Sequence, residues 1–170
     1  MQVSSDPWAD ALPLVARPSV GALLALCEEN FARLARLAPD LSQLEGRRLS
    51  PHASGVDLVL EVESQTRYMT LLRLTHLFPA GEGGVRSDPD ARLRAYHDAR
   101  QLEVLELEQS LWSMRNGYAP PTLAHKWRAN LFLAKWLDYC LGQGHCFLAA
   151  QPAISGSGAT ASGRRLPTCL

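Results

Sequence analysis

The sequence predicts an α+β domain in which an antiparallel meander of three strands, or four, is packed by three helices. Segments near both ends of the chain repeat apolar residues at three-to-four spacing, as helices with a buried face do. Between them, several segments alternate apolar and polar residues, as half-buried strands do. With 170 residues, 46% of them hydrophobic, the chain is long enough for one domain with a real core. We expect this domain to span residues 18–145.

The first predicted helix begins after Pro18 and ends before Pro39, with Ser19 as its N-cap. A serine caps a helix because its side chain accepts from the free N–H groups of the first turn, and proline cannot continue the helical hydrogen bonds. One apolar stripe runs along this segment, which indicates a single buried face. The stripe consists of Val20, Leu23, Leu24, Cys27, Phe31, Leu34 and Leu37.

Three segments predict strands. Residues 56–63 alternate apolar and polar side chains, and residues 67–78 carry apolar groups on both faces, which is typical of a middle strand. Residues 91–97 alternate again, after a glycine-rich segment at 79–90 that we interpret as a long exposed hairpin loop. Arg47-Arg48-Leu49 is the candidate for a fourth strand, at the edge. The short connection between the first two strands favours antiparallel pairing.

The spacing of the apolar residues along the sequence changes at Asp98. Beyond it, apolar and neutral side chains recur at three-to-four spacing, which predicts a second helix over residues 101–114. Asp98 with Gln101 three residues later fits a capping box, so we predict these two residues as a structural helix cap. The residues that suggest the helical period are Leu102, Leu105, Gln109 and Trp112.

The last predicted helix begins at Thr122 and runs to Leu141, before two glycines. Its apolar side chains cover most of the circumference, so it either lies at the centre of the core or carries a partner interface. We favour the core. Asn130, inside this helix, is a polar group that needs partners if it is buried.

The terminal segments and the net charge further narrow the classes of protein that this sequence fits. Residues 1–17 lack a period and predict a loose arm, and residues 146–170 predict a disordered tail rich in Gly, Ser and Ala. The 17 basic and 17 acidic residues cancel, which argues against a nucleic-acid partner. We expect a cytoplasmic protein, because no segment resembles a membrane span or a signal peptide. The cysteines lack metal-ligand spacing, so we expect no metal and no cofactor.

The candidate functional residues surround the predicted corner at Asp98. His97 and Arg100, with Tyr118 and Asn130 from the region of the last helix, form a candidate site for an anion such as a phosphate ester. Asp98 argues against this anion site, because the Asp98 carboxylate would already accept the hydrogen bonds of the backbone N–H groups that a bound anion needs. No catalytic residue stands out. We therefore favour a non-catalytic binding or adaptor protein with a protein partner, and keep an anion-binding or hydrolytic protein that uses His97 and Arg100 as the alternative. The oligomeric state is left open.

Four blocks of the sequence together carry a resemblance to a known family. The blocks are Leu26 to Leu34 with Pro39-Asp40-Leu41, Tyr96 to Arg100 with Glu103-Val104, Tyr118 with Pro120, and Asn130 to Leu133 with Trp136-Leu137 and Tyr139-Cys140-Leu141. In this order they resemble the YqiB-like proteins, small bacterial proteins grouped as a domain of unknown function. The resemblance implies a bacterial, cytoplasmic, single-domain protein and supplies no reaction. The chain departs from the family pattern at Pro121 and at Ala124-His125, which weakens a catalytic role for the acidic position that relatives carry before Lys126.

Overall fold

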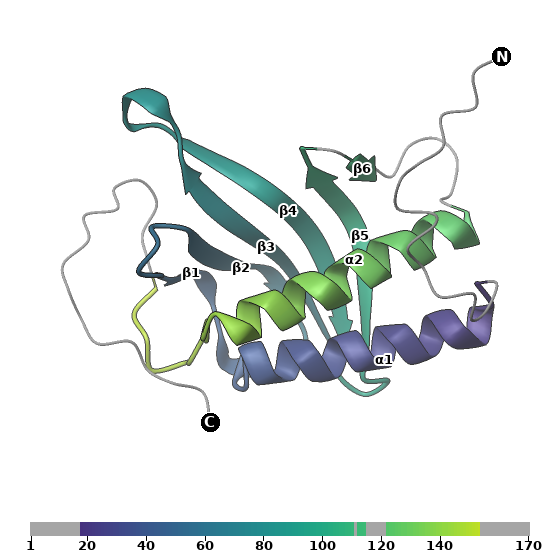
Figure 1. The fold of residues 1–170 in the computed structure, drawn as a ribbon. Helices are drawn as coiled ribbons and strands as arrows, with labels where there is room; N and C mark the ends of the chain where they lie inside the picture. Colours follow the sequence, from purple (N-terminus) through teal and green to yellow (C-terminus); the bar gives the residue numbers. More distant parts are fainter. Residues whose placement is uncertain (1–17, 111, 115–121, 154–170) are drawn as a thin grey trace, which may run out of the picture.

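A six-stranded antiparallel sheet with two long helices on one of its faces makes up the described part of the chain (Figure 1). The computed structural model describes residues 18–110, 112–114 and 122–153. Each strand pairs with its neighbours in the sequence, so the sheet is a simple meander. The predicted α+β class and antiparallel pairing are confirmed. The elements are α1 (Val20–Leu37), β1 (Gly46–Ser50), β2 (Asp57–Gln65), β3 (Met69–Pro79), β4 (Val85–Tyr96), β5 (Gln101–Gln109), β6 (Trp112–Met114) and α2 (Leu123–Gly142), with single 3-10 turns at Leu41–Gln43 and Gly81–Gly83.

The residues predicted to begin the first and last helices, Ser19 and Thr122, both act as N-caps. The Ser19 hydroxyl accepts from the Ala22 N–H at 3.1 Å, and the Thr122 hydroxyl accepts from the His125 N–H at 3.3 Å. The two helices lie side by side across the sheet, as Figure 1 shows. The core prediction for the last helix is confirmed, because its large apolar side chains are buried between α1 and the sheet. These are Leu133, Trp136, Leu137 and Cys140.

The core lies between the helices and one face of the sheet. Leu60 on β2, Leu74 on β3 and Leu93 on β4 are fully buried against the helices, and Leu34 on α1 meets them from the other side. Each such leucine contributes about 2 kcal/mol through burial. The predicted alternation of apolar and polar residues is therefore present in these strands, and the charged residues between the leucines lie on the opposite face of the sheet.

The predicted helix over residues 101–114 is wrong, because this segment forms β5 and β6. The error has a local cause. Arg92 pairs with Glu106 and the next residue, Leu93, pairs with Val104, so Leu105 is an extra residue in β5, a β-bulge. The bulge interrupts the period of two. Leu102, Val104 and Leu107 all reach the core, and their uneven spacing imitates a helical stripe.

Asp98 and Gln101 are consequently not a helix cap. Asp98 lies in the tight turn between β4 and β5, where its carboxylate accepts from the N–H of Ala99 at 2.9 Å. Arg100 in the same turn has φ of 51°. Gln101 is the first residue of β5 and pairs with Tyr96. The described residues thus contain two α-helices where three were predicted, and six strands where three or four were predicted.

Two other boundaries also differ from the predictions. The predicted exposed loop at 79–90 shrinks to the turn around Gly81–Gly83, because β4 already begins at Val85. The predicted tail begins too early: Phe147 is fully buried and its N–H donates to the Leu37 carbonyl at 2.9 Å. Residues 1–17 and 154–170 lie outside the described residues. No helix among the described residues is both long and apolar enough to cross a membrane.

Candidate functional site

His97 and Arg100, the two residues at the centre of the predicted anion site, meet on one side chain of α1. The His97 ring meets the Phe31 ring edge-on, with centroids 6.4 Å apart, and the Arg100 guanidinium lies over the same ring at 5.5 Å. His97 Nε2 also contacts the Thr70 hydroxyl at 2.8 Å. The predicted proximity of these two residues is therefore real, although the turn that holds them is a hairpin and not a helix start.

Asn130 lies on a different side of α1. Its side-chain amide donates to the Lys126 carbonyl at 2.9 Å, and its own carbonyl accepts from Asn30 Nδ2 at 2.9 Å. Asn30 precedes Phe31, so their side chains diverge by about 100° around the helix. Asn130 thus joins α2 to α1 inside the core and does not join His97. Tyr118, the fourth predicted residue, lies outside the described residues.

Cys27 completes this buried polar contact between the helices. Its thiol donates to Asn130 Oδ1 at 3.6 Å, and burial, together with the nearby Glu103, raises its pKa to about 11. Within the described part of the chain, Asn30 Oδ1 is buried and has no hydrogen-bond partner. The arrangement keeps Cys27 as a neutral donor, which is a structural role.

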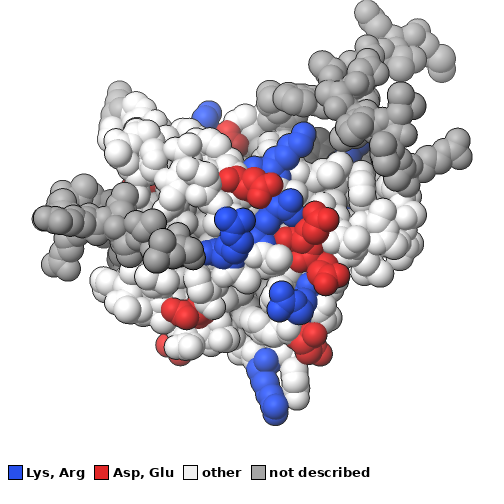
Figure 2. Space-filling model, turned by 60° about the horizontal axis from the view of Figure 1, so that its bottom comes forward, with Lys and Arg blue, Asp and Glu red and all other residues white. Residues whose placement is uncertain are grey.

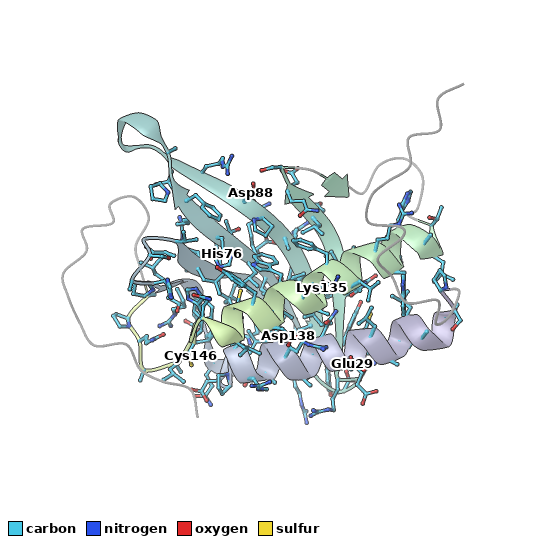
Figure 3. All side chains as sticks on the ribbon, in the orientation of Figure 1. Glu29, His76, Asp88, Lys135, Asp138 and Cys146 are labelled. Atoms are coloured by element: carbon cyan, nitrogen blue, oxygen red, sulfur yellow. The ribbon has the colours of Figure 1, made fainter. Side chains whose placement is uncertain are left out.

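Three histidines that the sequence reasoning missed form a cluster at the other end of the core. This histidine cluster consists of His52, His76 and His145, with ring centroids 5.5 Å apart for His52 and His145 and 5.7 Å apart for His76 and His145. Figure 3 shows His76 on the sheet beside the C-terminal part of α2. A signal for His76 was present in the sequence, because it continues the inward alternation of Leu72 and Leu74 along β3.

The hydrogen bonds of the cluster define its chemistry. Trp136 Nε1 donates to His76 Nδ1 at 2.9 Å, so the neutral imidazole carries its proton on Nε2. Burial, and then the charges of His145 and His52, lower the pKa of His76 to about 4. Burial and His52 also lower the pKa of His145, against the opposing effect of Asp57. The imidazoles of His76 and His145 are therefore held neutral at physiological pH.

A serine contacts the cluster, but its position does not suit a nucleophile. Ser50 Oγ lies 2.9 Å from His145 Nδ1 and also accepts from the N–H of Cys146. Ser50 and His145 are both at least 96% buried, so the pair fastens the segment after α2 to β1 instead of facing a substrate. Among the described residues, no group of three or more His, Cys, Asp or Glu side chains is arranged to hold a metal ion.

The sheet face away from the helices carries a cross-strand row of charged side chains. Arg47, Glu61, Arg73, Arg92 and Glu106 lie opposite one another in successive strands. We call this surface the open face, because neither described helix covers it (Figure 1). Other carboxylates reach the same arginines, so this row is not a basic patch. The ion pairs are Arg92 with Glu63 at 2.7 Å and Glu106 at 3.8 Å, Arg73 with Asp90 at 3.4 Å, and Arg94 with Glu103 at 3.9 Å.

Basic and acidic groups are interspersed elsewhere as well. In Figure 2, which brings the bottom of Figure 1 forward, Lys and Arg side chains alternate with Asp and Glu side chains in one band. On this view, neither sign of charge gathers into a large patch.

A hollow of about 200 Å³ opens on the open face, across β1 to β4. The Thr75 hydroxyl and the Arg73 Nε–H both approach Asp90 Oδ1, at 2.8 and 3.4 Å. Arg47 Nε is buried and has no hydrogen-bond partner among the residues that the structure describes. Neither His97, Arg100 nor Asn130 lines this hollow. The residues around it are Arg47, Val59, Glu61, Arg73, Thr75, Leu77, Ser87 and Asp90.

Comparisons with known proteins return uncharacterised relatives. A sequence model of one family, described as "Protein of unknown function (DUF1249)", matches residues 33–146. Proteins named "Uncharacterized protein YqiB" from Escherichia coli strains K12 and O157:H7 are 34% identical over 131 residues, which cover 75% of this chain and 91% of each relative. No solved structure matches the chain significantly.

Proposed function

Because this chain belongs to the DUF1249 family of YqiB-like proteins, for which no function is established, we propose its function from its own geometry: it is a non-catalytic binding module that receives a protein partner on the open face. One observation carries the proposal. Both described helices pack on the same side of the sheet, and the other side presents an ordered row of charged side chains with a hollow beside it.

The potentially reactive side chains support binding over catalysis. Burial raises the pKa of the Cys27 thiol to about 11 and that of the Cys140 thiol to about 12, so neither is a thiolate at neutral pH. The imidazoles of His76 and His145 are buried and neutral, and the hydroxyl of Ser50 is enclosed with them. A working nucleophile must be reachable by its substrate, and the buried side chains of Ser50, Cys27 and Cys140 are not exposed to one.

The charged row suits a partner interface better than α2 does. The apolar side chains of α2 are used in the core, with Tyr139 as its exposed large hydrophobic residue. Ion pairs at a solvated surface contribute only about 0–1 kcal/mol each, so exchanging them for pairs with a partner costs little. Such charges govern orientation and specificity more than affinity, as expected of an adaptor.

Charge reversal at the centre of the row tests this proposal. Arg92→Glu places an acid between Glu63 and Glu106, and a matched control, Lys135→Glu, makes the same change at an exposed position of α2. Tagged wild-type and variant proteins are used to capture partners from bacterial lysate, with quantitative mass spectrometry and a thermal melt of each protein. We expect one partner to disappear with Arg92→Glu and to remain with Lys135→Glu. Identical captures for all three proteins would refute the proposal.

The predicted anion site stays as a second candidate, because its two central residues do come together. Arg100 has no ion pair within the described part of the chain, and its guanidinium shares the Phe31 ring with His97. Titration with inorganic phosphate, observed through the NMR signals of the His97 ring, tests this site. A saturable shift that Arg100→Gln abolishes supports an anion site; no saturable shift in the wild type excludes it.

A further inference from the structure

The hollow on the open face offers both charges that an amino-acid head group needs. We propose that it binds a small zwitterion, a free α-amino acid, with its carboxylate on Arg47 and its ammonium on Asp90. This inference deepens the proposed function and depends on it only for the choice of face. It rests on one fixed carboxylate, one guanidinium whose buried Nε lacks an acceptor among the described residues, and the size and balanced charge of the hollow.

Asp90 supplies the acidic half of the site. Its neighbours Thr75 and Arg73 both approach Oδ1, at 2.8 and 3.4 Å, which fixes the carboxylate and leaves Oδ2 for another donor. An ammonium group has three N–H donors and no acceptor, so it suits such an oxygen. Glu61 on β2, two strands away from Asp90 and opposite Arg73, provides a second carboxylate within the same lining.

Arg47 supplies the basic half. Its Nε is buried without a hydrogen-bond partner, and the residue makes no ion pair within the described part of the chain. An unsatisfied buried donor destabilises a protein, so an acceptor that reaches this guanidinium is stabilised. A carboxylate is the best match, because its two oxygens can meet two N–H groups of one guanidinium.

The size and total charge of the hollow favour a small neutral molecule. Its volume of about 200 Å³ is below the range of about 300–1,000 Å³ that is usual for sites of drug-sized ligands. The formal charges of Arg47 and Arg73 cancel those of Glu61 and Asp90, so a net anion or cation meets as much repulsion as attraction. Val59 and Leu77 add apolar lining for an aliphatic side chain.

Titrations with free and blocked amino acids test each half separately. The full-length protein, labelled with ¹⁵N, is titrated with L-serine and L-leucine, with their N-acetyl derivatives, which lack the ammonium, and with their amides, which lack the carboxylate. We expect saturable shifts for residues of β1 to β4 with the free amino acids, and binding at least about tenfold weaker with either derivative.

Variants then connect each ligand group to one residue. Arg47→Gln should weaken binding of the free amino acid about tenfold, but should leave the already weak binding of the amide unchanged, because the amide has no carboxylate for Arg47. Asp90→Asn should likewise weaken binding of the free amino acid and leave binding of the N-acetyl derivative unchanged, because that derivative has no ammonium. Lys135→Gln, on α2, should bind like the wild type. If Asp90→Asn does not fold because it loses the contacts of Asp90, Arg47→Gln still tests the inference.

Three results would overturn the inference: no saturable shift with either free amino acid, equal binding of the blocked derivatives, or equal weakening by Lys135→Gln. The proposed function is judged separately. If the amino acids fail while Arg92→Glu still loses a captured partner, only the zwitterion site is wrong; if both experiments fail, the open face is not a binding surface.

Discussion

Buried His76 should make the stability of this protein depend on pH in one direction. The folded chain holds the pKa of this imidazole at about 4 instead of 6.5, because it is buried, lies beside two other histidines and accepts the Trp136 N–H at Nδ1. Protonation would therefore require the core around Trp136 to open. The perturbation is acid, and the matched variant is His76→Gln, whose amide oxygen can still accept from the indole but does not titrate.

The sign and the magnitude of this change in the free energy of unfolding follow from the linkage between proton binding and folding. Between pH 6.5 and about pH 4, the unfolded chain binds a proton at this histidine that the folded chain does not bind, so the free energy of unfolding falls as the pH falls. The difference between the two pKa values corresponds to about 3 kcal/mol, at 1.36 kcal/mol for each pH unit. His145, whose pKa is lowered for similar reasons, adds a loss in the same direction.

Urea unfolding followed by circular dichroism, from about pH 7.5 to about pH 4.5, measures this effect. We expect the wild-type protein to lose most of the 3 kcal/mol over this range, and His76→Gln to show a clearly smaller slope. His125→Gln, which removes an exposed histidine of α2, should follow the wild-type curve. If the wild type and His76→Gln run parallel, or if the wild type gains stability in acid, the assignment of a buried neutral imidazole is refuted.

Three further predictions concern the helix cap, the helix contact and the bulge. Ser19→Ala should lower the free energy of unfolding by about 1 kcal/mol in urea unfolding, because the Ala22 N–H loses its acceptor, and no change would argue against the cap. Asn130→Ala should cost about 2 kcal/mol in the same assay, because it leaves buried groups at Asn30 and Cys27 without their side-chain partner, whereas a neutral effect would mean that the contact contributes nothing. Deleting Leu105 should preserve a cooperative melt, because Val104 and Glu106 then follow each other opposite Leu93 and Arg92 and the core-facing residues of β5 keep their direction, and loss of the folded state would argue against Leu105 as the extra residue of a bulge.

The sequence predicted less of the candidate anion site than of the helices. His97 and Arg100 were expected to lie together, and they do, because only two residues of one turn separate them. Asn130 was expected to join them and does not, because its direction depends on how α2 packs against Asn30. The histidine cluster and the hollow each combine residues from several elements, so only a known strand register brings them onto one surface.

By itself, the sequence determined both helices, β2, β3 and the second half of β4, because caps, prolines and apolar periodicity are local signals that a segment carries whatever its neighbours are. Only the tertiary structure decided residues 101–109. Their spacing fits a helix as well as a bulged strand, and the outcome depends on hydrogen bonds from β4 and on burial against α1 and α2. Strand pairing is non-local in this sense: its free energy comes from partners that the segment itself does not contain.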